Sequence, residues 1–112
     1  MTDPRPRTPE AIIREVFARV RAGDPSAADL YAHDAVVTTQ QGQRHEGFPA
    51  IAAFYRHVVE NLKPQPHVET LYVNLPTVAA VIRAGDTDLR VLDVFTVVDG
   101  EIKELRICPP SP

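Results

Sequence analysis

The sequence predicts one α+β domain in which three N-terminal helices lie on one face of a bent, mainly antiparallel sheet. Three observations support this fold class. The first half of the chain has helical periodicity, residues 67–108 divide into four consecutive strand-like runs, and the 112 residues suit a single domain. Prolines gather near both ends. We therefore expect one domain over residues 1–112, with an ordered body of about residues 8–108 and extended proline-rich tails.

The first helix is predicted from its start signal and its apolar stripe. Thr8 is a hydroxyl N-cap, and Pro9 follows at the first helical position. Gly23 ends the helix. The stripe at helical spacing comprises Ile12, Ile13, Val16, Phe17 and Val20.

Two further helices follow. Asp24 and Pro25 predict a short second helix that runs through Leu30 and Tyr31. The third helix begins at 47–49 and ends before Pro64. Its amphipathic face comprises Ile51, Phe54, Tyr55, Val58 and Leu62.

Strands are predicted from β-branched and apolar runs. A short strand at 35–39 is followed by a turn and a brief return segment at 44–46. Four longer strands are expected at 67–74, 77–84, 88–98 and 101–108. The last two are joined by Asp99-Gly100, a strong two-residue hairpin signal, because both central positions need positive φ.

The strand at 88–98 is apolar on both alternating sets of residues. One set comprises Val91, Asp93, Phe95 and Val97, and the other comprises Leu92, Val94, Thr96 and Val98. An antiparallel strand with one wet face should alternate apolar and polar residues. Because three short helices can cover only one face, we expect a second copy to cover the other and form a homodimer through the sheet. A slightly apolar exposed sheet is the alternative.

Composition excludes several classes of partner. The net charge of −3 and the absence of a basic run argue against nucleic acid. The apolar runs are too short to cross a membrane, and the first residues lack the apolar segment of a secretory signal. One cysteine allows no internal disulfide. These features favour the cytoplasm.

Three segments carry a family resemblance. They are residues 22–24 with 30–35, residues 46–47 with 50–55, and residues 92–95 with 99–102 and 105–106. In this order and spacing they resemble the nuclear transport factor 2-like superfamily, and within it the ketosteroid isomerase and SnoaL-like branch. The resemblance spans nearly the whole chain. It implies a cone-shaped, curved, mainly antiparallel sheet that wraps around the three N-terminal helices and encloses an apolar pocket. It specifies the fold more than an activity.

Asp93 is the main catalytic candidate. It lies in mid-strand on the face of Val91, Phe95 and Val97, where an unpaired carboxylate would be costly and should take up a proton. The resemblance implies the same, because the isomerases keep a protonated pocket acid at this position. The alternatives are a structural aspartate paired with Arg106 or Arg90, or an aspartate exposed at the strand edge.

Other pocket residues come from the resemblance. Tyr31 and Tyr55 match positions whose hydroxyls belong to the pocket network, although tyrosines in a core commonly serve packing alone. Val16 stands where the isomerases have the oxyanion-hole tyrosine, and Thr39 stands where they have the catalytic base. A replacement base must come from elsewhere, and His45 and Glu46 are the nearest titratable candidates. Of the two, His45 could act near pH 7. As a lone histidine on a short hairpin, it can equally be a surface residue.

The expected catalytic residues are Asp93, Tyr55 and His45. Asp93 is expected to hydrogen-bond the developing enolate oxygen with support from Tyr55, and His45 is a candidate base. The expected ligand-binding residues are Val16, Phe17, Tyr31, Thr39, Phe54, Phe95 and Arg106. The scattered histidines form no pair at i, i+4 with an acid, so we expect no metal site, and no organic cofactor is needed.

Three functions remain open from the sequence. The first is an enzyme that performs proton-transfer chemistry (isomerisation, cyclisation or dehydration) on a small apolar carbonyl or polyketide-like substrate. The second is a non-catalytic domain that binds a small apolar molecule, which fits Val16 and Thr39 at two catalytic positions. The third is a structural dimerisation module whose pocket is filled by its own side chains.

Overall fold

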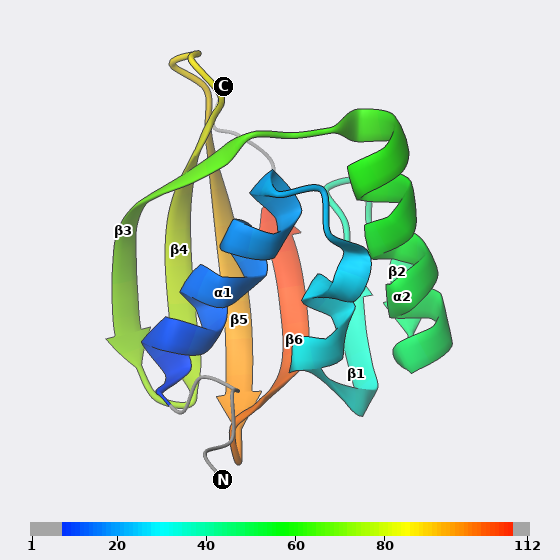
Figure 1. Ribbon diagram of the computed structural model, residues 1–112. Coiled ribbons are helices and arrows are strands. Elements are labelled where there is room, and N and C mark those ends of the chain that lie inside the picture. Colours follow the sequence, from blue (N-terminus) through cyan, green and yellow to red (C-terminus); the bar gives the residue numbers. More distant parts are fainter. Residues whose placement is uncertain (1–7, 109–112) are drawn as a thin grey trace, which may run out of the picture.

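A computed structural model describes residues 8–108, and the proline-rich tails predicted above lie outside the described residues. The fold is α+β, with helices packed against an open, curved six-stranded sheet (Figure 1). The elements are α1 (Pro9–Arg21), η1 (Pro25–Leu30), β1 (Tyr31–Thr38), β2 (Arg44–Glu46), α2 (Phe48–His57), η2 (Val58–Leu62), β3 (Pro66–Asn74), β4 (Thr77–Ala84), β5 (Arg90–Val98) and β6 (Glu101–Cys108). Within residues 8–108, no helix has the length and apolar character needed to cross a bilayer.

The first helix forms as its sequence signals indicate. The side chain of Thr8 accepts a hydrogen bond from the backbone N–H of Ala11 at 3.1 Å and so caps one of the free amides at the helix start. All five residues of the predicted apolar stripe are buried. The stripe therefore holds α1 against the sheet.

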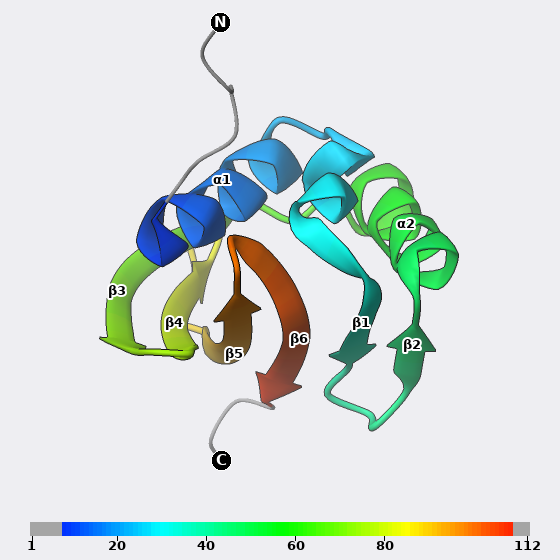
Figure 2. The ribbon, with the colours of Figure 1, turned by 90° about the horizontal axis from the view of Figure 1, so that it is seen from below.

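The sheet is mixed, and its strand order is β2-β1-β6-β5-β4-β3. Only β1 and β6 run parallel, and the other neighbouring pairs are antiparallel. Figure 2 shows the sheet curving beneath α1, η1 and α2, which all lie on its concave side. The core lies between these helices and the concave face, where Phe17 of α1 meets Phe95 of β5 edge-on with ring centroids 6.0 Å apart.

The hairpin between β5 and β6 confirms the turn predicted from the sequence. Asp99 has φ 53° and Gly100 has φ 77°, the left-handed conformation that this two-residue turn needs. Aspartate tolerates that region better than most residues with a side chain. The register also shifts at this end of the pair, because the consecutive residues Thr96 and Val97 pair with Glu104 and Ile102. The extra residue, Lys103, therefore forms a bulge on β6 near the turn.

Two elements differ from the sequence-based expectation. Tyr31 begins β1 rather than ending the second helix, because its extended backbone pairs with Ile102 of β6. The third helix does not stay α-helical. It continues as the π-helical turn η2, which closes with a 2.8 Å bond from the N–H of Lys63 to the carbonyl of Val58.

The convex face of the sheet is apolar at its centre. The register places Tyr72, Ala79 and Val94 in one row across β3, β4 and β5. The next row contains Val81 and Leu92. Within the described chain, the side chains of Tyr72 and Leu92 are 63% and 39% exposed, because all helices lie on the opposite face.

Candidate active site

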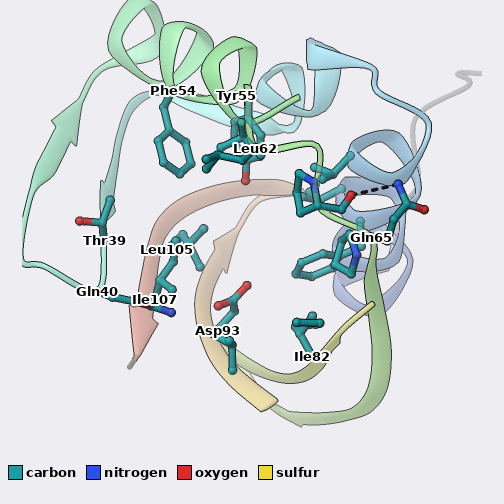
Figure 3. Close-up of a pocket in the computed structure, with 18 of the residues that line it drawn as sticks. Thr39, Gln40, Phe54, Tyr55, Leu62, Gln65, Ile82, Asp93, Leu105 and Ile107 are labelled. Carbon is teal, nitrogen blue, oxygen red and sulfur yellow. Dashed lines mark hydrogen bonds between the residues drawn. The ribbon is translucent and has the colours of Figure 1, made fainter. Parts of the chain in front are cut away.

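A cavity of about 590 Å³ opens between α1, the end of the α2–η2 segment and the concave side of β4, β5 and β6 (Figure 3). Pockets for small molecules are typically roughly 300–1,000 Å³ and mostly apolar. Among the residues that line this cavity, only Asp93 and Tyr55 have titratable side chains. Exposed polar residues stand at its mouth, including Gln40, Gln41 and Gln65.

Asp93 is the one buried carboxyl group among the described residues. It lies in the middle of β5, opposite Ala80 on β4 and Ile107 on β6, and it is 8% exposed. Its Oδ1 is buried and has no hydrogen-bond partner in the described chain. Figure 3 shows the carboxyl group pointing into the pocket.

Burial raises the pKa of Asp93 from 3.8 to about 7, because the apolar surroundings disfavour the charged form. The two cations considered as structural partners do not reach it. Arg90 pairs with Glu69 at 2.7 Å, and Arg106 is exposed on β6. The structural ion-pair alternative is therefore wrong, and so is the exposed-edge alternative.

Tyr55 and Tyr31 form a buried hydroxyl pair beside the cavity. Their oxygens are 2.6 Å apart, and both side chains are almost fully buried. Burial raises the pKa of each hydroxyl well above its ordinary value, and a negative charge on Asp93 raises both further. The two hydroxyls therefore stay protonated. When Tyr31 donates to Tyr55, the proton of Tyr55 is free to point into the cavity.

The structure brings together most of the residues selected from the sequence. Seven line the cavity, namely Val16, Phe17, Thr39, Phe54, Tyr55, Asp93 and Phe95. Tyr31 stands behind Tyr55 and acts through its hydroxyl. Two selected residues lie outside the lining, His45 and Arg106.

His45 and Arg106 are displaced for simple geometric reasons. His45, on β2, places its ring 4.8 Å from the ring of Phe54, so Phe54 contacts the cavity and His45 does not. Arg106 alternates with Leu105 and Ile107, which both line the cavity, so its side chain belongs to the opposite face of β6.

Several lining residues were not selected from the sequence. Strand alternation could have found Ile82 and Leu105, because the first pairs with Val91 and the second with Phe95. No simple signal marks the contribution of η2. Val58 and Leu62 reach the cavity through a π turn, which helical periodicity does not reveal.

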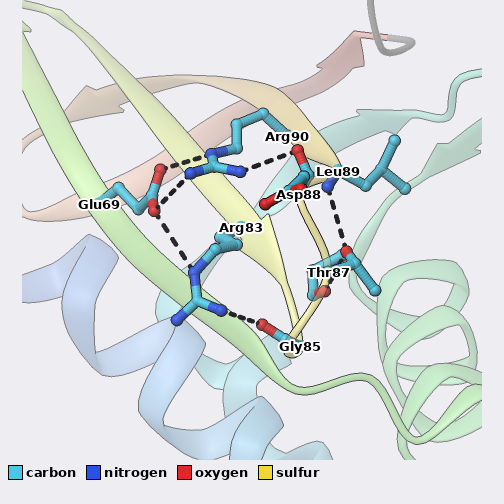
Figure 4. A network of polar contacts seen from close by, with 8 residues as sticks. Glu69, Arg83, Gly85, Thr87, Asp88, Leu89 and Arg90 are labelled. Atoms are coloured by element: carbon cyan, nitrogen blue, oxygen red, sulfur yellow. Dashed lines mark hydrogen bonds and ion pairs between the residues drawn. The ribbon is translucent and has the colours of Figure 1, made fainter.

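A charged network secures the rim. Glu69 of β3 binds Arg90 of β5 at 2.7 and 3.1 Å and lies 3.4 Å from Arg83 of β4 (Figure 4). Arg83 also donates to the carbonyl of Gly85, whose N–H donates to the carbonyl of Gln65 at 2.9 Å. The network thereby ties the β4–β5 turn to the segment that follows η2, and both line the cavity.

The site therefore combines one carboxyl that titrates near neutral pH, one protonated phenol and an apolar wall. These groups can remove and return a proton and can hydrogen-bond an oxygen that gains negative charge. Within residues 8–108, no group of three or more His, Cys, Asp or Glu side chains could hold a metal ion.

Comparison with known proteins identifies a matching domain family and several structures of similar fold. The SnoaL-like domain family matches residues 13–105. A nuclear transport factor 2-like protein from Mesorhizobium loti superposes with a TM-score of 0.79 at 21% identity, over 98% of each chain. SalBIII, an epoxide hydrolase/cyclase-like enzyme with a role in pyran ring formation in the polyether salinomycin, superposes with a TM-score of 0.78 at 20% identity, over 88% of each chain.

A third similar structure is a protein from Kribbella flavida that is provisionally described as a ketosteroid isomerase. Its TM-score is 0.74 at 23% identity, over 91% of this chain and 77% of that one. No protein of curated function matches the sequence at a significant level. Identities this low show a shared fold and leave the reaction open.

The raised pKa of Asp93 predicts a pH-dependent loss of stability. Above about pH 4 the unfolded chain releases a proton that the folded chain keeps up to about pH 7, so rising pH favours unfolding across that window. From about pH 5 to about pH 8, we expect the free energy of unfolding to fall by about 2 kcal/mol more in the native protein than in Asp93→Asn. Urea titrations at both pH values measure this difference.

The control for this experiment is Asp34→Asn. Asp34 is exposed, and its pKa is lowered by the hydrogen bond from Lys103. It therefore titrates below the window, and its variant should follow the native pH profile. If native protein and Asp93→Asn also show parallel profiles, the carboxyl is not perturbed by burial.

Proposed function

The chain belongs to the SnoaL-like domain family, and from that premise we propose that it is an enzyme that moves a proton on a small, mostly apolar carbonyl compound. The reaction class is isomerisation, cyclisation or dehydration. One observation carries the proposal: a buried carboxyl without a partner faces the same apolar cavity as the hydroxyl of Tyr55.

In the proposed step, ionised Asp93 removes a proton from the carbon next to the carbonyl group. The electrons of that C–H bond form a C=C bond, and the carbonyl oxygen gains negative charge. Tyr55 donates a hydrogen bond to this oxygen, and Tyr31 orients Tyr55. Asp93 then returns the proton to a different atom of the substrate. A base with a pKa of about 7 suits both halves of this exchange.

This assignment changes the role first expected for Asp93. The sequence suggested that Asp93 hydrogen-bonds the enolate oxygen and that His45 supplies the base. Because His45 does not line the cavity, we assign the role of base to Asp93. Tyr55 then takes the role of hydrogen-bond donor to the enolate oxygen. Val16 and Thr39, which also line the cavity, then shape the pocket and take no part in proton transfer.

The similar structures support the reaction class indirectly. SalBIII functions in the closure of a pyran ring, and the Kribbella flavida protein carries the provisional name of an isomerase. A non-catalytic binding domain is the second candidate, and one observation favours it: the hydroxyl of Thr39 accepts a bond from the N–H of Gln43 at 3.2 Å, where the isomerases have a carboxylate. The third candidate, a structural dimerisation module whose pocket is filled by its own side chains, does not agree with a cavity of about 590 Å³.

Proton abstraction is testable without knowledge of the natural substrate. With 2-tetralone in D₂O, we expect the native protein to accelerate deuterium incorporation next to the carbonyl group, followed by proton NMR. The rate should rise as pH increases through about 7, because ionised Asp93 is the base. The rate of deuterium incorporation should fall roughly 100-fold or more in Asp93→Asn and roughly 10- to 100-fold in Tyr55→Phe.

Tyr72→Phe is the matched control, because Tyr72 is a tyrosine on the convex face, 63% exposed, and should leave the exchange rate unchanged. Binding of 2-tetralone without accelerated exchange would instead establish the non-catalytic binding domain.

We also propose that the convex face of the sheet pairs with that of a second copy. The exposed apolar rows of Tyr72 and Leu92 support this, as do Glu104 and Arg106, which lie on the same face of β6 two residues apart. Neither makes an ion pair within the described chain. A twofold axis that crosses between them would bring each into reach of the opposite charge on its partner.

Sedimentation measures this assembly directly. We expect the native protein to sediment with twice the mass of one chain, and Leu92→Lys to sediment as a monomer because a charge would enter an apolar interface. Leu75→Lys is the control, since Leu75 is 61% exposed but lies in the β3–β4 turn outside the strands. A native monomer at tens of micromolar contradicts the proposal.

A further inference from the structure

We propose that the cavity also binds an apolar amine in its ammonium form, with the carboxylate of Asp93 as the counterion and the aromatic wall around it. This is a binding activity that requires no turnover. It rests on the electrostatic asymmetry of the pocket and not on the reaction proposed above.

The first argument is the absence of any cation near Asp93. From α1 the cavity is faced by Val16, Phe17 and Val20, from β4 by Ile82 and Ala84, and from β6 by Leu105 and Ile107. None of these side chains ionises. From α2 the titratable group that faces the cavity is Tyr55, and Tyr31 of β1 lies behind it. Both hydroxyl groups stay protonated.

The nearby arginines are engaged elsewhere. Arg83 and Arg90 both bind Glu69 in the rim network, and neither lines the cavity. Arg90 is exposed, and Arg83 also donates to the carbonyl of Gly85. A ligand cation is therefore the one partner that could neutralise the carboxylate of Asp93 within the described pocket.

The second argument is the chemistry of the wall. The rings of Phe17, Phe54, Tyr55 and Phe95 all line the cavity. Aromatic faces attract ammonium groups, and this attraction strengthens when water is excluded. The same wall holds the apolar part of an amine by ordinary burial of surface.

Together these features make the pocket selective for the sign of a ligand's charge. A cation gains an ion pair and aromatic contacts, and a neutral molecule gains burial and a hydrogen bond from Tyr55 or Asp93. An anion enters beside a carboxyl group with no positive side chain lining the cavity. The preference for an ammonium ion should grow as pH rises, because ammonium binding favours ionised Asp93.

A matched pair of probes tests the inference: 1-naphthylmethylamine and 1-naphthalenemethanol, which differ in the terminal amine or hydroxyl. In calorimetric titrations near pH 8, we expect the native protein to bind the amine at least about tenfold tighter than the alcohol. Near pH 5.5, where Asp93 is mostly protonated, the preference should shrink at least about threefold. Asp93→Asn should still bind the alcohol and should show no preference for the amine over the alcohol at either pH.

Equal affinities for amine and alcohol in the native protein near pH 8 would overturn the inference, and so would failure to bind either probe or a preference that persists in Asp93→Asn. If that variant does not fold, the pH dependence in the native protein decides the question. Deuterium exchange into 2-tetralone is scored separately. A preference for the amine without deuterium exchange therefore supports the inference and contradicts the proposed enzyme. Deuterium exchange without a preference for the amine supports the proposed enzyme and contradicts the inference.

Discussion

The structure depends on one constraint: a carboxyl group is held inside an apolar cavity, and no cation among residues 8–108 pairs with it. Asp93 lies on the concave face of β5 among residues that are otherwise apolar, and one of its oxygens makes no hydrogen bond within the described chain. Such a group is costly to ionise, so burial moves its pKa to about 7. A fold selected for stability alone would place an apolar residue there. In the proposed reaction, the raised pKa of Asp93 is what lets this group take up and release a proton near neutral pH.

The rest of the fold keeps that carboxyl available. Tyr31 and Tyr55 satisfy each other's hydroxyl groups at 2.6 Å, so one donor faces the cavity without itself becoming an unsatisfied buried group. The arginines of β4 and β5 are bound by Glu69 at the rim (Figure 4). The π turn η2 brings Val58 and Leu62 to the cavity, while the mouth remains open beside exposed glutamines.

Much of this arrangement could be predicted from sequence because it follows local rules. The cap at Thr8, the stripe of α1 and the Asp99-Gly100 turn each rest on residues within a few positions of one another. Alternation along β5 placed Asp93 on the same face as Phe95, and both are buried. The family resemblance adds the prediction that the hydroxyl groups of Tyr31 and Tyr55 belong to the hydrogen-bond network of the pocket.

The parts that sequence could not supply depend on distant contacts. Tyr31 starts a strand because its backbone pairs with Ile102 of β6, far along the chain, and its hydroxyl meets Tyr55; local capping signals carry no trace of either contact. The sequence leaves His45 as a candidate base, whereas the structure places its ring against that of Phe54 and outside the cavity lining. The engagement of Arg90 by Glu69 depends on pairing across three strands. These contacts decide which residue holds the proton, so they also decide the proposed chemistry.

The most direct test is the titration of Asp93 itself, followed by the carbon-13 chemical shift of its carboxyl group in the native protein. Asp34, which is exposed and whose pKa is lowered by the hydrogen bond from Lys103, provides an internal reference in the same spectrum. We predict that Asp93 titrates with a midpoint near 7, as expected for a desolvated carboxyl without a cation. A midpoint near 4 would mean that water or a cation reaches the group, and it would contradict this account of the site.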